Sequence, residues 1–264
     1  MKYEDGKWEL PAFEAFQFLP KQHKYCVCIF VINEGVKFHK QLNNMKYLFD
    51  QIDIVVADGG SSDGSVEHKK LQGFNVNTLL IKQSAGKLGT QMRMAYAWAL
   101  KRGYEGVVVI DGNGKDSFDD IPDFISRLDA GYDHIQGSRF ILGGYHENTP
   151  LLRLIGLKLL HVPLIRLASG FKYTDTTNGF RAYSARLLAD PNIATFRSIF
   201  DGYELHYYLA VKAARLGFKC IEIPVTRKYP ASGKVPTKIS LIKGNLQVIE
   251  RLLKVVQGKY DVQR

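Results

Sequence analysis

An apolar strand that ends in a polar loop constrains the fold and the ligand position of this chain more than any other stretch does. Residues 107–110 are Val-Val-Val-Ile, and β-branched residues of this kind favour a buried strand. The next five residues, Asp111-Gly-Asn113-Gly-Lys115, break the strand with two glycines and supply an acid, an amide and an amine. Because ligands bind at the carboxyl ends of the strands in parallel α/β sheets, we expect Asp111 to contact a ligand.

The alternation of strand and helix recurs along the chain and predicts an α/β fold. Apolar runs predict strands at 25–32, 52–57, 76–81, 134–139 and 219–225, and the segments between them predict helices at about 35–49, 87–102, 118–128 and 204–216. Such βαβ units build a mostly parallel central sheet with helices on its faces. We expect residues 1–24 to form an arm packed on this single domain.

Polar residues follow four of the predicted strands. Glu34, Asp58, Asp111 and Arg139 each stand where a strand ends. Right-handed crossovers bring all of these loops to one edge of the sheet. Three acids and an arginine at one edge predict a binding site.

Two glycine-rich loops narrow the choice of ligand. The loop from Asp58 to Ser65 has neither the G-x-G-x-x-G dinucleotide spacing nor that of a phosphate-binding loop. Asp58 could accept hydrogen bonds from a base or a ribose, or it could simply stabilise a turn. Lys87 and the backbone N–H groups that open the helix at 87–102 would suit a diphosphate, although Lys87 could equally be a solvated surface lysine.

Composition restricts the partners and the compartment. The formal net charge of +10 favours anionic partners, such as nucleotides, phosphates or an anionic membrane surface. The basic residues are dispersed, which disfavours a nucleic-acid-binding protein. Three cysteines (Cys26, Cys28 and Cys220) make neither a four-ligand zinc site nor an even disulfide framework. With no secretory signal at residues 1–5, we expect a cytoplasmic protein.

Six short motifs follow one another between about Tyr25 and Lys238. They are Asn33-Glu34, Asp58-Gly-Gly-Ser-Ser-Asp-Gly-Ser, Gly86-Lys87, Asp111-Gly-Asn113, Gly137-Ser-Arg139 and Asp175-Thr-Thr-Asn-Gly-Phe-Arg181. Together they resemble the family-2 glycosyltransferases, and most of all the polyprenyl- (dolichyl-) phosphate mannose synthase-like branch. The resemblance implies a GT-A fold and an inverting sugar transfer from a UDP- or GDP-sugar. It implies as acceptor a polyprenyl phosphate, or a hydroxyl of a glycan or lipid-linked glycan, in cell-surface polysaccharide assembly.

The resemblance also divides the chain and assigns roles. Residues 25–236 correspond to the catalytic domain, with a nucleotide-binding half at about 25–140 and an acceptor half at about 141–236. The nucleoside would contact Glu34 and Asp58, and the diphosphate would contact Lys87, Asp111, Asn113 and Lys115. Donor and acceptor would be enclosed by Arg139, Arg181 and Lys234, the last of these in a basic loop that follows Arg227.

The motif at Asp111 departs from the family pattern. Asn113 replaces the second acid of the D-x-D metal motif, and Lys115 stands where synthase relatives often carry a further polar ligand. Asp111 and Asn113 could still hold Mg²⁺ or Mn²⁺ together with the diphosphate. Alternatively, the Lys115 ammonium could neutralise the diphosphate without metal. A third reading is a non-catalytic nucleotide-sugar-binding or scaffold protein.

The acceptor half contains two candidate general bases, Asp201 and Glu204. A sugar hydroxyl needs a carboxylate within hydrogen-bonding reach in order to attack, whereas a lipid phosphate is already ionised. Both acids could instead be stabilising groups at the start of a helix.

Residues 150–168 are the most apolar stretch of the chain, and Pro163 is expected to interrupt any long helix there. An element lying in a membrane interface fits this stretch, but so does packing on the sheet or against a second subunit, which leaves a homo-oligomer open. No run reaches the roughly 20 apolar residues of a membrane span. A basic amphipathic helix is predicted at 237–264, so we expect any membrane contact to be peripheral.

Overall fold

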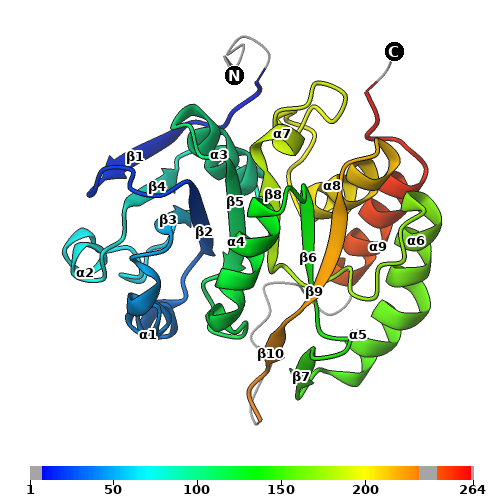
Figure 1. Cartoon of the computed structure of the whole chain (residues 1–264), viewed down its shortest axis with the longest axis horizontal. Coiled ribbons are helices and arrows are strands. Elements are labelled where there is room, and N and C mark those ends of the chain that lie inside the picture. The colour runs from blue at the N-terminus through cyan, green and yellow to red at the C-terminus, as the bar shows by residue number, and fades with distance from the viewer. Residues whose placement is uncertain (1–7, 232–242, 263–264) are drawn as a thin grey trace.

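A central sheet with helices on both faces organises the computed structural model, which describes residues 8–231 and 243–262 (Figure 1). The strand order is β1-β4-β3-β2-β5-β8-β6-β9. The strands are β1 (Phe13–Gln17), β2 (Tyr25–Val31), β3 (Asp53–Asp58), β4 (Thr78–Lys82), β5 (Gly106–Asp111), β6 (His134–Ser138), β8 (Arg181–Ser184) and β9 (Cys220–Pro224).

Most strands of this sheet are parallel, as predicted. β2 pairs in parallel with both β3 and β5, β3 with β4, and β6 with β9. Every residue of β2 and β3 is buried, because helices cover both faces of the sheet. This double coverage explains why these strands are continuous apolar runs in the sequence rather than alternating ones.

Two antiparallel strands were not predicted. β8 lies between β5 and β6, so its first residue, Arg181, pairs with Val109 and Gln136 near the carboxyl ends of those strands. β1 pairs with β4 and forms one edge of the sheet, so the predicted arm at 1–24 contributes a strand to it. Both strands have five residues or fewer, too few for an alternating pattern to stand out.

The helices form two layers. One face is covered by α3 (Leu88–Lys101), α6 (Val162–Ser169), α8 (Glu204–Arg215) and α9 (Lys243–Val256), and the other by α1 (Gly35–Asn44), α2 (His68–Gly73) and α4 (Ile121–Asp129). The remaining elements are α5 (Leu151–Gly156), α7 (Ala185–Leu188), η2 (Lys46–Leu48), η3 (Phe118–Asp120), η4 (Leu157–His161) and the paired strands β7 (Tyr145–Glu147) and β10 (Thr226–Lys228).

Helical structure continues through Pro163, contrary to the expected interruption. α5, the π-helical η4 and α6 follow one another without a break, and Pro163 is the second residue of α6. A π turn widens the hydrogen-bond pattern and accommodates the missing N–H of proline. This segment ends at Gly170, whose φ of +74° is favourable for glycine at a helix end.

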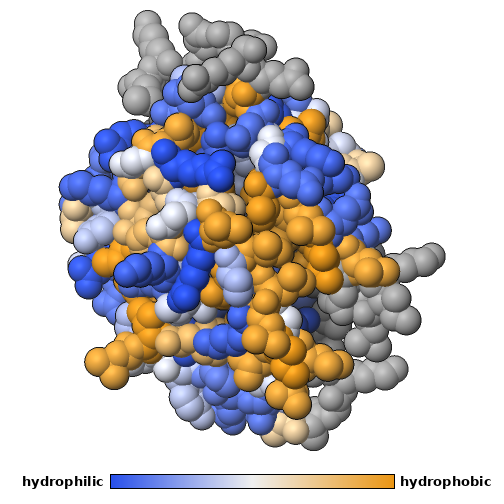
Figure 2. Space-filling view, turned by 90° about the vertical axis from the view of Figure 1, so that its right-hand side faces the viewer, coloured by the Kyte–Doolittle hydropathy of each residue, from blue (hydrophilic) through white to orange (hydrophobic). Residues whose placement is uncertain are grey.

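Leucine side chains of this continuous segment point outward. Leu152, Leu159 and Leu167 are 83%, 75% and 79% exposed. Figure 2, which shows the right-hand side of Figure 1, displays hydrophobic residues gathered on this face. Within the described residues, no helix is long and apolar enough to cross a bilayer.

Candidate active site

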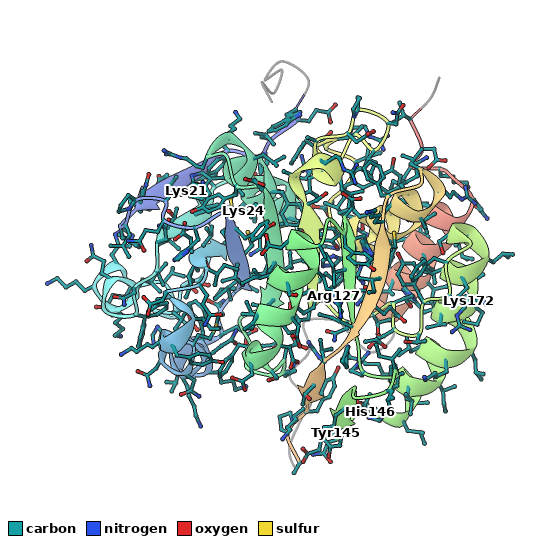
Figure 3. All side chains as sticks on the ribbon, viewed as in Figure 1. Lys21, Lys24, Arg127, Tyr145, His146 and Lys172 are labelled. Atoms are coloured by element: carbon teal, nitrogen blue, oxygen red, sulfur yellow. The ribbon has the colours of Figure 1, made fainter. Side chains whose placement is uncertain are left out.

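The carboxyl ends of the parallel strands gather the predicted site loops at one edge of the sheet. Asp58 of β3 pairs with Val31, and Asp111 of β5 pairs with Phe30, so the two acids end the strands on either side of β2. Figure 3 places Tyr145 and His146 of β7 at this end of the molecule and Lys21 and Lys24 at the other.

Asp58 is fully buried and holds its own loop together. Its Oδ2 accepts hydrogen bonds from the amides of Gly60 and Ser61, each at 2.9 Å, and its Oδ1 accepts one from the Ser61 hydroxyl. In this structure Asp58 therefore stabilises a turn, and its contact with the nucleoside stays a prediction. The loop also holds Glu34, because the Ser65 hydroxyl accepts the Glu34 amide at 3.1 Å.

The loop that follows β5 is clamped at several points. The Gln41 side chain donates to the Asp111 carbonyl at 3.1 Å and accepts the Gly114 amide at 2.9 Å. The Lys115 amide donates to the Asn113 side chain, and the Lys115 carbonyl accepts the amide of Lys228 at 2.8 Å. The Asp111 carboxylate is 30% exposed, so it lies in a rigid loop and remains accessible.

An arginine from a distant part of the chain contacts this loop. Arg227 donates from Nη2 to Asp111 Oδ2 at 3.3 Å and from Nη1 to the buried carboxylate of Asp116. Burial alone would lower the pKa of Arg227, but Asp116 and Asp111 outweigh it and raise that pKa well above its usual value. Arg227 is therefore a permanent cation at the Asp111 carboxylate.

Further cations surround Tyr229, two residues beyond Arg227. The Arg153 guanidinium donates to the Tyr229 hydroxyl at 3.0 Å, and the Lys115 ammonium lies 5.5 Å from the centre of the Tyr229 ring. Burial raises the pKa of Tyr229, but Arg227, Arg153 and Arg139 outweigh it and lower that pKa overall. These groups create a positive potential beside Asp111.

Arg139 is held by Asp175, the first residue of the motif that ends at Arg181. Its Nε and Nη2 donate to the two oxygens of buried Asp175 at 2.6 and 2.9 Å. Burial would raise the pKa of Asp175, but Arg139 outweighs it and lowers that pKa. The loop after Asp175 reaches the centre of the site, since a Cβ added at Gly179 would lie 3.4 Å from Asp111 Oδ1.

Arg181 points into the protein interior. It is 1% exposed and donates to the backbone carbonyls of Asn178, His206 and Thr176, each at 2.9 Å. These bonds connect the loop before β8 to α8. Its predicted contact with substrate stays a prediction, and the structure gives it a role in shaping the site from inside.

The start of α3 already has an anionic partner, the side chain of Asp201. Asp201 Oδ1 accepts hydrogen bonds from the Lys87 amide at 2.9 Å and from the Thr90 hydroxyl at 3.0 Å. The approach is close, because a Cβ at Gly89 would lie 2.7 Å from the backbone of Asp201. The predicted diphosphate position at these N–H groups is thus filled by a carboxylate, and the Lys87 ammonium donates to Gln247 of α9 at 3.4 Å.

Neither predicted general base is arranged as one. Burial raises the pKa of Asp201, but hydrogen bonds from Lys87 and Thr90 outweigh it and lower that pKa, which weakens the group as a base. Glu204 is fully buried and accepts the amides of Asp201 and Gly202, each at 2.6 Å, and its other oxygen pairs with Arg251. In this structure both acids are groups that stabilise the start of a helix, Asp201 at α3 and Glu204 at α8.

Four contributors to this site were given no role in it by the sequence: Asp116, Arg153, Asp175 and Tyr229. Arg227 appeared there only as the residue before a basic loop. Asp116 and Arg227 are 111 residues apart, and no local pattern predicts such a pair. Lys234 lies outside the described residues.

The donor groups at Asp111 do not fit a divalent cation well. Among residues 8–231 and 243–262, no group of three His, Cys, Asp or Glu side chains could hold a metal ion. The Asp111 carboxylate already accepts hydrogen bonds from Asn113 and Arg227, and Asp116 is neutralised by Arg227. A Mg²⁺ or Mn²⁺ ion at Asp111 and Asn113 would thus have only two protein ligands here, one carboxylate that already accepts hydrogen bonds and one amide.

The chain is similar in sequence to a monophosphomannose synthase and to a mannosyltransferase. It is 28% identical over 203 residues to polyprenol monophosphomannose synthase of Mycolicibacterium smegmatis, covering 76% of each chain. It is 29% identical over 198 residues to undecaprenyl-phosphate mannosyltransferase of Micrococcus luteus, covering 74% of this chain and 79% of the other. No family model matches the chain.

Solved structures confirm the GT-A fold. Glucosyl-3-phosphoglycerate synthase of Mycobacterium tuberculosis, in complex with Mn²⁺, UDP-glucose and phosphoglyceric acid, superimposes with a TM-score of 0.64. The match covers 88% of this chain and 79% of that one, at 17% sequence identity.

Proposed function

Since the chain is a glycosyltransferase of the GT-A fold, related to polyprenyl-phosphate sugar transferases, we propose that it moves a sugar from a nucleotide diphosphate to a polyprenyl phosphate. The observation that carries this proposal is the cation cluster beside Asp111. Lys115, Arg153 and Arg227 surround Tyr229, and they suit a site that binds two anions, the donor diphosphate and an acceptor phosphate.

The arrangement of the acids supports a phosphate acceptor over a hydroxyl. A hydroxyl would need a general base, and both candidates are committed to helix starts, Asp201 at α3 and Glu204 at α8. A phosphate monoester is ionised at neutral pH and attacks without one. The acceptor phosphate oxygen forms a bond to the anomeric carbon as the bond from that carbon to the donor diphosphate breaks. The electron pair passes to the diphosphate oxygen, and the configuration inverts.

Preorganised positive charge supplies the catalytic contribution in this scheme. Negative charge builds up on the leaving diphosphate in the transition state, and fixed cations near that oxygen lower the barrier. Lys115 and Arg227 are held by the clamped loop and by buried Asp116, so they need no rearrangement. Glu34 and Asp58 remain the proposed nucleoside contacts at the other side of β2.

The outward-facing leucines of α5, η4 and α6 would bring the enzyme to its lipid acceptor. Two basic residues of the same segment contact the rest of the domain: Arg153 donates to Tyr229, and Lys158 lies 3.6 Å from the centre of the Phe140 ring. An element with exposed apolar side chains and basic residues suits an anionic membrane surface. We place the protein peripherally on such a surface; its cytoplasmic location and its place in polysaccharide assembly stay predictions.

A transfer assay tests the proposal. UDP- and GDP-sugars are first screened by thermal shift, because a ligand that binds the native state raises its melting temperature. The stabilising donor is then incubated with a polyprenyl phosphate or with the same polyprenol lacking the phosphate. We expect product only from the phosphate. Transfer to the alcohol alone, or no stabilisation by any donor, would contradict the proposal.

The Asp111→Ala variant provides the matched control for this assay. Asp111 is partly exposed and lies in a loop with several other clamps, so we expect the variant to fold with a melting temperature near that of the wild type. We expect its transfer activity to be lost. Unchanged activity would show that the reaction takes place elsewhere.

A further inference from the structure

The most unusual feature of the site is the number of protein cations at the position expected for a metal. Asp111 Oδ2 accepts hydrogen bonds from Arg227 Nη2 at 3.3 Å and from Asn113 Nδ2 at 3.2 Å. Asn113 is an amide, so it adds no negative charge, and its side chain donates to the carboxylate instead of joining it as a second acid. The local chemistry therefore provides hydrogen-bond donors where a metal would require ligands.

Lys115 completes this arrangement. It is only 8% exposed, and its backbone is pinned on both sides, by Asn113 and by Lys228 of β10. Burial and the neighbouring Arg227 outweigh the Asp111, Tyr229 and Glu34 side chains and lower the pKa of Lys115. An incoming diphosphate would favour the charged ammonium. A lysine that is sequestered and held in this way is suited to one anionic ligand.

The negative charges of the cluster are already balanced without a metal. Two carboxylates, Asp111 and Asp116, are accompanied by three basic side chains, Lys115, Arg153 and Arg227. A divalent cation would bring two more positive charges next to those of Lys115 and Arg227. With a neutral side chain at 115 and a second acid at 113, the same cluster would carry a net negative charge and would attract such an ion.

We propose that Lys115 and Arg227 replace the divalent cation, so that this enzyme binds and activates its donor diphosphate without metal. The inference rests on the proposed function. Lys115 would act as a point charge on the diphosphate, and Arg227 would set the charge and orientation of Asp111. The leaving diphosphate would then be stabilised by the protein alone, and sugar transfer would be independent of Mg²⁺ and Mn²⁺.

Calorimetric titration of UDP and GDP tests this inference directly. We expect the better of the two nucleotides to bind the wild type in excess chelator with an affinity within about threefold of that in Mn²⁺ or Mg²⁺. Affinity that rises tenfold or more with either metal would overturn the inference and leave the proposed function intact. No binding of either nucleotide under any condition would overturn both.

Substitution of Lys115 identifies the group responsible. We expect Lys115→Gln to weaken diphosphate binding in chelator about tenfold or more while binding of the nucleoside monophosphate changes less than about threefold. Lys115→Arg, which keeps the charge, should retain most of the affinity. Lys40→Gln, on the exposed side of α1, is the matched control and should bind as the wild type does. Equal affinities of Lys115→Gln and wild type would contradict the assignment.

A gain of metal dependence is the sharpest outcome. The double variant Asn113→Asp and Lys115→Gln restores a second acid and removes the internal cation. We expect its diphosphate affinity to be low in chelator and to rise tenfold or more with Mn²⁺. Melting temperatures of all variants establish that they fold. A double variant that stays indifferent to Mn²⁺ would contradict the idea that charge at 113 and 115 decides metal use.

Discussion

Glu204 is a buried carboxylate that connects several elements next to the candidate site. It accepts two backbone amides and pairs with Arg251, and this joins the loop at 201–202 to both α8 and α9. Through that loop it also positions Asp201, which accepts the Lys87 amide at the start of α3. Its hydrogen bonds therefore hold three helices together next to the site.

A conservative substitution separates this structural role from general-base catalysis. Glu204→Gln keeps an oxygen that can accept the two amides but cannot take up a proton, so we expect turnover per folded molecule to stay within about threefold of the wild type. Loss of a general base would cost about 10²–10⁴-fold. Transfer kinetics corrected for folded protein decide between the two, and a hundredfold loss would contradict our assignment.

The companion variant Glu204→Ala should act on stability. It leaves two amides next to the buried carboxylate position without an acceptor, and each unsatisfied buried group costs about 1–3 kcal/mol. We expect the free energy of unfolding to fall by roughly 2–4 kcal/mol in urea denaturation. The same stability for Glu204→Ala and for wild type would show that these hydrogen bonds contribute little.

At the scale of elements, the segment formed by α5, η4 and α6 joins an exposed apolar surface to the candidate site. Leu157 and His161 are buried against the domain, while Leu152, Leu159 and Leu167 face outward. Single exposed leucines are ordinary on protein surfaces, but a row of them along a continuous segment marks an interaction surface. Because Arg153 lies in the same segment and contacts Tyr229, docking of this face would place lipid head groups near the cation cluster.

Removing the outward leucines should therefore affect membrane binding and not stability. We expect the triple variant Leu152→Gln, Leu159→Gln and Leu167→Gln to keep its melting temperature and to bind vesicles that contain anionic lipid at least about tenfold more weakly. Leu216→Gln, at the far end of α8, is the control and should bind normally. Flotation with phosphatidylglycerol vesicles measures both. Unchanged binding by the triple variant would contradict membrane docking through this face.

For the whole molecule, a buried polar cluster around Arg181 makes stability depend on pH. His134, His161 and His206 are buried, and burial together with the Arg181 charge lowers the pKa of each, to about 3 for His134 and His161. In the folded state these histidines stay neutral, whereas in the unfolded chain they take up protons below about pH 6.5. Their contribution to stability is complete above pH 6.5 and declines as the pH falls toward 3.

We expect the free energy of unfolding to decrease between pH 6.5 and 4.5, by roughly 1 kcal/mol per pH unit for each such histidine. His161→Gln should reduce that slope, because it removes one proton taken up on unfolding. The matched control is His68→Gln, at an exposed position on α2, which should keep the wild-type slope. Urea denaturation across this pH range measures all three proteins. A His161→Gln slope equal to that of the wild type would contradict the neutral buried histidine.

The sequence alone determined the order of the main strands and helices and the edge on which the loops meet. Those inferences depend on local facts, namely which residues are apolar, where glycines break strands, and the handedness of parallel crossovers. For the same reason the loop at Asp111 could be predicted as the centre of a candidate site. The resemblance to glycosyltransferases followed from several short motifs in order, each of them local.

The tertiary structure decided what each side chain does. Asp201, Glu204 and Arg181 looked like reacting groups in the sequence. In the structure Asp201 and Arg181 make long-range hydrogen bonds to backbone groups, and Glu204 pairs with Arg251 of α9. Arg227 looked like part of a loop and became the partner of Asp111. A side chain's charge and role depend on what surrounds it, and residues more than 100 positions away provide those surroundings here.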